Sequence, residues 1–360
     1  MLARVLFIPL AVVVAYSMVE RSKAPIAAND NRVRAGHLRE GVLTVNIEAR
    51  EGVWHPEGAK GLAIETAAFA EQGKTLQTPG PLIRVPVGTE VRATITNRLD
   101  KAMWLHGMGA SRGMRDSVNI APHVSHRFTF KATEPGVFYY AGRTGPDPVA
   151  ARLNGDSQLG GVIPVDPPNA RADVNERILA ITSWFTIDAR TKSGLGPNST
   201  IAFNGGAWPA TDRLTFTQGD TVHFRIANMS ILDHPLHLHG FYFTVDAKGD
   251  GARDTIYTAD ERRSAVTEYV APMSTMSMRW VAERPGNWIF HCHFASHMAN
   301  RASFKADRTD MTPHMQHASS SMLDHMSSLV IGMSATRSSL AGRLTRPMQT
   351  RCRCLARCSN

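Results

Sequence analysis

Residues 88–97 read GTEVRATITN, and residues 219–228 read GDTVHFRIAN, with glycine, valine, isoleucine and asparagine at the same spacing. In both stretches apolar residues alternate with polar ones, which is typical of a half-buried β-strand. Each stretch is followed by a His-Gly pair, at His106 and at His239. Because self-similarity at a fixed spacing marks repeated structural units, the chain is predicted to be a tandem duplication of one β-domain.

The residues around the repeat form further short strand-like segments separated by Gly and Pro. The clearest are 42–47, 83–87 and 90–96, and no long amphipathic helix is evident. Short strands at this spacing are typical of antiparallel sandwiches. The expected fold class is therefore all-β, with two tandem Greek-key β-sandwich domains and a flexible C-terminal tail.

The Pro- and Asn-bearing stretch at 166–169 is the expected linker between the two domains. Domain one is predicted at 36–167 and domain two at 173–333. Within domain two, residues 305–326 are rich in Met and His, and residues 328–332 are expected to return to the domain as one more strand. We expect the Met- and His-rich segment either to capture Cu(I) or to be a plain linker.

Composition is that of an ordinary globular chain, with 360 residues, 43% hydrophobic and 20% charged, which excludes disorder, collagen and coiled coil. The formal net charge is +9, but residues 334–360 contain six arginines and no acidic residue, so this basic tail supplies +6 and the rest only +3. The tail also holds Cys352, Cys354 and Cys358. Because the body has no basic face interleaved with aromatics, no nucleic-acid partner is expected.

The N-terminus carries an apolar run at 5–16 that follows Arg4 and precedes Glu20, Arg21 and Lys23. A run of this length suits a secretory signal and is short for a membrane-spanning helix. We therefore expect residues 1–24 to be a signal peptide or N-terminal anchor, and the protein to be periplasmic or secreted. Since no clean A-x-A cleavage site follows, an uncleaved membrane anchor is the alternative.

The strongest chemical signal is a pair of short segments that together contain six histidines and one cysteine. They read HPLHLHG at 234–240 and HCHFASH at 291–297. Imidazole and thiolate are ligands for zinc or copper, and two His with one Cys is the ligand set of a blue-copper centre. Cys292 is the only cysteine outside the tail, and a free thiol in an exported protein is usually oxidised unless it is buried or bound to metal.

The alternation of side chains along a strand sorts these residues into two metal sites. His291 and His293 point to one side of their strand, and Cys292 points to the other. The first predicted site contains His234, Cys292 and His297, and the second contains His237, His239, His291 and His293. We expect Cys292, His291 and His293 to be the catalytic residues, because the bonded path between them joins the two sites for electron transfer.

On these motifs the chain resembles a two-domain, laccase-like member of the multicopper oxidase family, which is built of cupredoxin domains. The resemblance covers roughly residues 40–304, with TPGPLIR at 78–84, HPLHLHG at 234–240 and PGNWIFHCH at 285–293 as matching motifs. It implies cupredoxin-like domains and copper as the cofactor. The implied roles are type 1 ligands for His234, Cys292 and His297, a type 2 ligand for His237, and type 3 ligands for His239, His291 and His293.

Domain one departs from the pattern that the resemblance implies. The family's first domain supplies two His-x-His pairs, whereas this chain has WLH at 104–106 and AGR at 141–143. His106 is therefore either a surviving metal ligand or a turn histidine. The residue five positions after His297, which by this resemblance would hold the axial copper ligand, is Ala302, and alanine cannot bind a metal. A type 1 copper here is therefore expected to be three-coordinate and to have a higher reduction potential than a site with an axial thioether. A complete three-copper cluster is not expected.

Several other residues are expected to be structural. Trp104, Tyr139 and Tyr140 are interpreted as core packing, and His123 and His126 as solvated.

Two functions follow from the sequence and the resemblance. The first is an exported copper oxidoreductase that oxidises a reducing substrate by one electron at a type 1 copper and transfers the electron to a neighbouring His-bound copper. The alternative is a copper electron-transfer or copper-binding protein that has lost oxygen-reducing activity. The expected partners are a small-molecule or protein electron donor, O2 under the first function only, and further copies of the chain in a homo-oligomer such as a trimer.

Overall fold

The computed structural model describes residues 23–109, 114, 116–170, 173–186, 199–294, 297 and 330–336. The described elements are strands together with one short 3-10 helix, η1 (Val149–Ala151). Within these ranges no helix is long and apolar enough to cross a membrane. Residues 1–22 of the predicted signal or anchor (1–24), the Met- and His-rich segment at 305–326, the axial position Ala302 and residues 337–360 of the predicted tail (334–360) lie outside the described residues. Ala24 belongs to the first strand and residues 334–336 to the last one.

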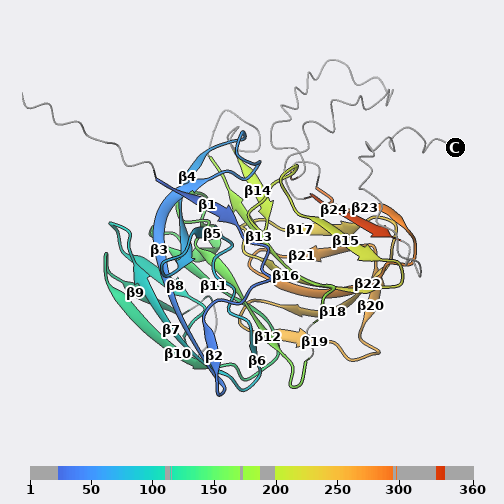
Figure 1. Ribbon diagram of the computed structural model, residues 1–360, viewed down its shortest axis with the longest axis horizontal. Coiled ribbons are helices and arrows are strands. Elements are labelled where there is room, and N and C mark those ends of the chain that lie inside the picture. Colours follow the sequence, from blue (N-terminus) through green and yellow to red (C-terminus); the bar gives the residue numbers. More distant parts are fainter. Residues whose placement is uncertain are drawn as a thin grey trace, which may run out of the picture.

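The first half of the chain forms a seven-stranded and a five-stranded sheet (Figure 1). The larger sheet has the order β1-β5-β4-β3-β7-β10, with β2 beside β3, and the smaller has the order β6-β12-β11-β8-β9. Apolar side chains from both sheets, among them Leu43, Ile95 and Phe138, form one buried core between them. The bounds are β1 (Ala24–Ala28), β2 (His37–Arg39), β3 (Val42–Trp54), β4 (Ile64–Glu71), β5 (Leu76–Thr78), β6 (Val85–Pro86), β7 (Glu90–Asn97), β8 (Met103–His106), β9 (Ser117–Ile120), β10 (Ser125–Lys131), β11 (Gly136–Arg143) and β12 (Gly160–Asp166).

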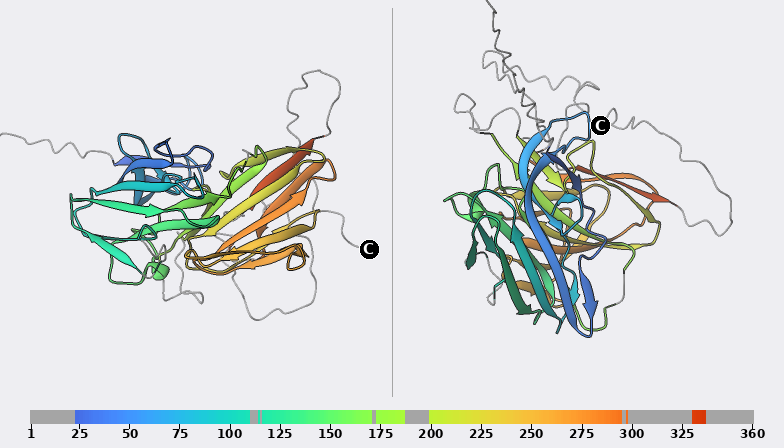
Figure 2. Two further views of the ribbon diagram at one scale, coloured as in Figure 1. Left: turned by 90° about the horizontal axis from the view of Figure 1, so that it is seen from below. Right: turned by 60° about the vertical axis from the view of Figure 1, so that its left-hand side comes forward.

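The second half repeats this architecture, and Figure 2 shows the two halves side by side. Its larger sheet has the order β14-β13-β16-β22-β18-β19, with β20 beside β18, and its smaller sheet has the order β15-β24-β23-β17-β21. Buried residues such as Phe224, Trp280 and Phe290 fill the space between them. The bounds are β13 (Glu176–Trp184), β14 (Thr200–Phe203), β15 (Arg213–Thr217), β16 (Thr221–Asn228), β17 (His234–Leu238), β18 (Phe243–Gly249), β19 (Asp254–Ile256), β20 (Arg263–Ala265), β21 (Thr267–Val270), β22 (Thr275–Val281), β23 (Gly286–Cys292) and β24 (Val330–Thr336).

The all-β prediction is confirmed, and the internal repeat occupies equivalent places in the two halves. The first copy forms β7, which pairs in parallel with β3 and antiparallel with β10. The second copy forms β16, which pairs in parallel with β13 and antiparallel with β22. The predicted returning strand is also present, because β24 pairs with both β23 and β15.

The first sheet begins earlier in the chain than the sequence indicated. β1 pairs in parallel with β3 and β5, although domain one was predicted to start at residue 36. Ile26 of β1 is buried and packs with Trp54 and Leu76. Residues 24–28 are therefore an integral strand of the first sheet.

The two halves are joined by an apolar interface. Val137, Tyr139 and Ala141 of β11 pack against a group of domain-two side chains: Ile178, Ala180, Ala227, Met229 and Met273. The Tyr139 hydroxyl donates a hydrogen bond to the carbonyl oxygen of Met273. Tyr140 lies on the opposite side of β11 in the core of the first half, so the prediction that both tyrosines are core packing is confirmed.

A closed ring of four charged side chains also connects the halves. Arg84 donates to both carboxylate oxygens of Asp166, at 2.7 and 3.0 Å, and its Nη1 lies 2.6 Å from Glu176 Oε2. Arg225 completes the ring with contacts of 3.0 Å to Asp166 Oδ1 and 2.7 Å to Glu176 Oε1. Since Arg84 and Asp166 belong to the first half and Glu176 and Arg225 to the second, the ring ties the halves together where the linker runs.

Candidate metal centre

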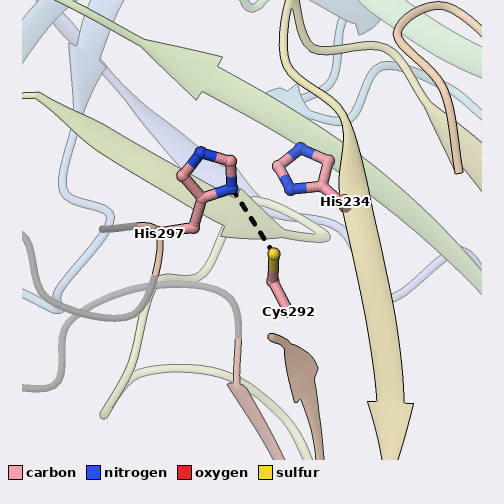
Figure 3. Close-up of side chains that lie close together, drawn as sticks. All are labelled: His234, Cys292 and His297. Carbon is pink, nitrogen blue, oxygen red and sulfur yellow. Dashed lines mark hydrogen bonds between the residues drawn. The ribbon is translucent and has the colours of Figure 1, made fainter. Parts of the chain in front are cut away.

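The first cluster is formed by His234, Cys292 and His297 (Figure 3). His234 begins β17, Cys292 ends β23, and His297 follows β23 with its backbone N–H bonded to the carbonyl oxygen of Phe294 at 3.0 Å. All three residues are buried, and one ligand atom from each lies within 4.8 Å of the other two. Cys292 Sγ is 3.4 Å from His297 Nδ1. The structure thus brings together the three residues predicted for the first site.

Strand pairing explains why the ligands separate into two clusters. β17 and β23 are antiparallel, with Leu236 opposite Cys292 and His237 opposite His291. Directly opposed residues share a face of the sheet, and neighbours along a strand point to opposite faces. Cys292 and His234 therefore face the core, whereas His237 and His291 face the other way.

The donor set of the first cluster fits copper. His234 Nδ1 is buried and has no hydrogen-bond partner among the described residues, so its lone pair is available to a cation. Burial lowers the pKa of His234 to about 3 and raises the pKa of the Cys292 thiol to about 12. The imidazole is therefore neutral, while the thiol keeps its proton until a bound cation displaces it. Two imidazoles and one soft thiolate are the ligand set that selects copper in trigonal sites.

The second cluster contains His237, His239 and His291, whose ligand atoms also lie within 4.8 Å of one another. His239 Nε2 is 2.9 Å from His291 Nε2. His291 Nδ1 donates to the carbonyl oxygen of Cys292 at 2.7 Å, and His237 Nδ1 lies 2.7 Å from the hydroxyl of Thr267. Because a carbonyl oxygen can only accept, the His291 proton is on Nδ1, and its Nε2 lone pair faces His239 inside the cluster, where a metal would replace the contact between the two rings. The contact of His237 Nδ1 with the Thr267 hydroxyl orients the His237 ring with Nε2 as its other ligand atom.

Electrostatics favour the neutral, ligating form of these rings. Burial is the largest of the effects that lower the pKa values of His237 and His239. It is also the main reason that the pKa of His291 is lowered to about 4. The neighbouring imidazoles lower these values further, since two positive rings this close would repel each other.

The fourth residue predicted for the second site, His293, lies at its rim. Its ring centroid is 5.2 Å from that of His237 and 5.9 Å from that of His291, but its side chain is exposed. The structure therefore brings three of the four predicted residues into ligand contact and leaves the fourth beside them.

The second cluster opens into a groove that solvent reaches. His237, His239, Tyr242 and Arg284 line it, and Tyr242 is 74% exposed. The Arg284 guanidinium lies 5.4 Å from the ring centroids of both Phe241 and Trp288. Sequence reasoning did not single out Arg284, since only the fold brings it next to the histidines.

In the first half, the segments aligned with the family's His-x-His pairs do form neighbouring strands. β8 pairs with β11 so that His106 lies opposite Ala141 and Trp104 opposite Arg143. The Arg143 guanidinium lies 4.7 Å from the Trp104 ring centroid and donates to the carbonyl oxygen of Gly145 at 2.8 Å. A cation–π pair thus stands where the resemblance implied metal-binding imidazoles.

His106 is buried, and it belongs to neither cluster in the part of the chain that the structure describes. Its Nδ1 lies 2.7 Å from the carbonyl oxygen of Met114, and its Nε2 has no partner among the described residues. Burial is the main cause that lowers the His106 pKa, and the charges of Arg143 and Arg152 lower it further. These two guanidinium groups also disfavour a cation at His106, so its role as a ligand stays a prediction.

The two histidines predicted to be solvated lie as expected. His123 is exposed and contacts Asp100 at 3.1 Å, and His126 is exposed with its ring against Phe128. Both are solvated, as the sequence indicated.

Low pH is expected to destabilise the copper-free protein. The folded-state pKa values of His234 and His291, about 3 and about 4, lie below the ordinary value of about 6.5. The unfolded chain therefore binds more protons than the folded chain below that pH, and the stability present above pH 6.5 is lost as the pH falls towards about 4 for His291 and about 3 for His234. Each histidine contributes a slope of at most about 1.4 kcal/mol per pH unit.

Urea denaturation of copper-free protein at pH 7, 6 and 5 measures this slope. Replacing both histidines by Gln should make the slope shallower over this range, where few carboxylates titrate, while the other histidines with lowered pKa values, such as His237 and His239, keep their share of it. An equal slope in the double variant would contradict the assignment to His234 and His291.

Comparison with known proteins agrees with the geometry. The family model described as multicopper oxidase matches residues 182–308. A probable nitrite reductase-hydroxylamine oxidoreductase fusion protein of Kuenenia stuttgartiensis is 27% identical, over 74% of this chain and 30% of its own. Putative laccase-1 of Oryza sativa subsp. japonica is 35% identical, over 28% of this chain and 19% of its own. The chain thus spans less than a third of the length of these curated relatives.

Solved structures share the fold over most of the chain. A blue copper oxidase from Nitrosomonas europaea superimposes with a TM-score of 0.61 at 18% identity, covering 81% of this chain and 85% of that one. A copper nitrite reductase from the same organism gives a TM-score of 0.58 at 19% identity, covering 82% and 94%. The family match falls on residues 182–308, which carry both clusters, and the likeness to solved structures extends over both halves. The second half therefore matches the multicopper oxidase family, the two halves share the fold of these copper proteins, and the donor sets of both clusters fit copper.

Proposed function

We propose that this protein is a copper oxidoreductase that takes single electrons from a reducing substrate at the His234, Cys292 and His297 site and transfers them to the site of His237, His239 and His291. The observation that carries the proposal is that Cys292 and His291 are consecutive residues of β23 and belong to different clusters. Copper, when bound to thiolate and imidazole, supplies the one-electron redox chemistry. The protein supplies the ligands and the path between the sites.

Two routes for electrons join the two clusters, and both pass through Cys292 and His291. One is the covalent backbone between Cys292 and His291. The other is the hydrogen bond of 2.7 Å from His291 Nδ1 to the Cys292 carbonyl oxygen. Both routes are fixed by β23, which pairs with β17 and β24 on its two sides.

The entry side for electrons is the edge of the first cluster near Phe294. His297 is buried, and its ring centroid lies 5.2 Å from that of Phe294, which is 41% exposed. A small-molecule or protein donor that contacts Phe294 is therefore separated from His297 by one ring. This arrangement suits an outer-sphere donor, which needs proximity but no direct bond to the metal.

A second candidate, an electron-transfer or copper-binding protein without oxygen reduction, is favoured by one observation in the first half. Ala141 lies opposite His106, and Arg143 stacks on Trp104, so imidazoles are absent from three of the four positions that the family pattern places there. Under this candidate the first cluster works as above, and electrons leave to a partner other than O2.

Copper content and spectra test the proposal. The full chain, loaded with copper and dialysed, should hold two copper ions, one with intense visible thiolate charge-transfer absorption and one with only weak absorption. A protein without the intense band would overturn the proposal. Oxygen consumption with a phenolic donor separates the candidates, because only the oxidase consumes O2.

We also propose that the protein is exported and forms a homo-oligomer such as a trimer. The apolar run at 5–16 supports export, and the partly exposed second cluster, open to its groove, supports contact with a neighbouring copy. Cell fractionation and light scattering of the purified protein test the two statements.

A further inference from the structure

Ser230 lies directly behind the first cluster, on the loop that follows β16. Its side chain is buried, and its hydroxyl oxygen contacts three groups: Asn228 Oδ1 at 2.7 Å, His234 Nε2 at 2.9 Å and the Leu232 carbonyl oxygen at 3.1 Å. The Leu232 backbone N–H donates to the same hydroxyl at 3.2 Å. A hydroxyl has one proton and two lone pairs, so the directions of these bonds can be assigned.

The orientation of the Asn228 amide is fixed by its nitrogen. Asn228 Nδ2 donates to the carbonyl oxygens of Leu232, Ala271 and Val270, at 2.7, 2.8 and 3.3 Å. Its Oδ1 is therefore the atom that faces Ser230, and a carbonyl oxygen can only accept. The Ser230 hydroxyl donates to it, because this is the shorter of its two contacts with carbonyl oxygens, 2.7 Å against 3.1 Å to Leu232, and two acceptor lone pairs facing each other at 2.7 Å would repel. Both carbonyl oxygens can only accept, so neither contact leaves the proton for His234.

The proton on His234 follows from this assignment. With its one proton directed at Asn228, Ser230 can only accept from His234, so Nε2 carries the hydrogen. Nδ1 then has the lone pair, and it is the buried atom without a hydrogen-bond partner among the described residues. The centroid of the His234 ring lies 5.0 Å from the centroid of the His297 ring. Figure 3 shows the His234 ring beside Cys292 and His297.

We propose that Ser230 is a positioning residue that fixes His234 in the Nε2–H tautomer and thereby presents Nδ1 to copper. The inference rests on the proposed function in taking His234, Cys292 and His297 as the copper site. An outer hydrogen bond of this kind orients the ligand ring and raises its basicity, so its loss weakens metal binding by about 10- to 100-fold.

The first half of the chain provides an internal comparison. Asn97 makes the same turn as Asn228: its Nδ2 donates to the carbonyl oxygens of Lys101 and Ile120, at 2.8 and 2.9 Å, and its Oδ1 accepts from the backbone N–H of Leu99 at 3.0 Å. In the second half the backbone N–H of Ser230 makes the corresponding bond at 3.1 Å. Since the turn forms equally well with Leu99, the fold does not need the hydroxyl, and it is present only in the half that holds the His-Cys-His cluster.

The tautomer can be measured without copper. Long-range proton–nitrogen NMR spectra of the copper-free full chain should show His234 with its proton on Nε2. In Ser230→Ala the Nε2–H has no acceptor in a buried site, and Nδ1–H directed at Cys292 becomes the better choice. Observation of the Nδ1–H tautomer in the unmodified protein, or of an unchanged Nε2–H signal in Ser230→Ala, would overturn the inference.

Copper affinity supplies the second readout, by competition with a chelator of known strength. Ser230→Ala should bind copper at the first cluster about 10- to 100-fold more weakly and show a higher reduction potential, because a less basic imidazole stabilises Cu(II) less. Ser230→Thr, which keeps the hydroxyl, should restore both values.

The matched control is Ser274→Ala, which removes a hydroxyl bonded to the Ala271 carbonyl oxygen at 2.7 Å in the adjoining turn and leaves His234 untouched. It should leave tautomer, affinity and potential unchanged. Absence of the charge-transfer band from the unmodified protein would refute the proposed function. Normal copper binding with equal values in both alanine variants would refute the role of Ser230 alone.

Discussion

Replacement of Cys292 by Ser should abolish the intense visible absorption of the copper-loaded protein and stop one-electron oxidation of the donor. The serine hydroxyl is a hard ligand that stays protonated at neutral pH, so the site loses the thiolate that both holds copper and absorbs. Cys292 is fully buried, and Ser is close to it in size, so the fold should persist. Copper analysis and the visible spectrum of the purified variant measure the effect, which is complete loss of the band.

The matched control removes the other cluster. His239→Ala takes away the ring that lies 2.9 Å from His291 Nε2, and it leaves His234, Cys292 and His297 in place. This variant should keep the intense band and lose the weakly absorbing copper, whereas Cys292→Ser should do the reverse. If either variant lost both coppers together, the two clusters would not be separate sites.

The separation into two clusters was predictable from the sequence because it depends on strand alternation alone. Cys292 and His291 are neighbours on a strand, so they must point to opposite faces. The prediction was less accurate for His293, because β23 ends at Cys292. Beyond the end of a strand, alternation no longer fixes the direction of a side chain, and His293 lies at the rim.

The role of Ser230 was not predictable in the same way. A single serine before a histidine motif has no periodic signal, and its hydroxyl acquires a direction only when Asn228 is fixed by three carbonyl oxygens. One weak signal was present in the sequence, since the internal repeat aligns Ser230 with Leu99. A polar residue in place of a buried leucine indicates that the two copies differ in function at that position.

The sequence shows which histidines of the first half are missing and which residues replace them, but it does not show where the replacing Arg143 points. The motif comparison showed Ala141 and Arg143 in place of ligands, and it left open where Arg143 points. Cross-strand pairing with Trp104 decides this, because it places the guanidinium over the indole. Such a pairing depends on the register between β8 and β11, which local sequence does not specify.

Removing one charge from the ring of four charged side chains that joins the two halves should strongly lower the stability of the protein. Glu176→Gln leaves Arg84 and Arg225 facing only Asp166, and the Glu176 side chain is 7% exposed. Breaking a buried ion pair by removing one partner costs about 3–5 kcal/mol, because the remaining charge is desolvated without compensation. The ring's other members are slightly more exposed, so we expect a loss of about 3 kcal/mol in the free energy of unfolding, measured by urea denaturation of the copper-free protein.

The control is a surface carboxylate that makes a contact of the same length. Glu65 lies 2.7 Å from Lys23 Nζ with its side chain 68% exposed, and Glu65→Gln should change stability by less than about 1 kcal/mol, because water already solvates both charges. Equal losses in the two variants would contradict the ring's role. A double variant, Glu176→Gln with Arg225→Gln, should recover part of the loss, since residues in one ion-pair network are coupled and the second change removes a cation left without its partner. This recovery would locate the effect in the ring itself and not in the local packing of β13.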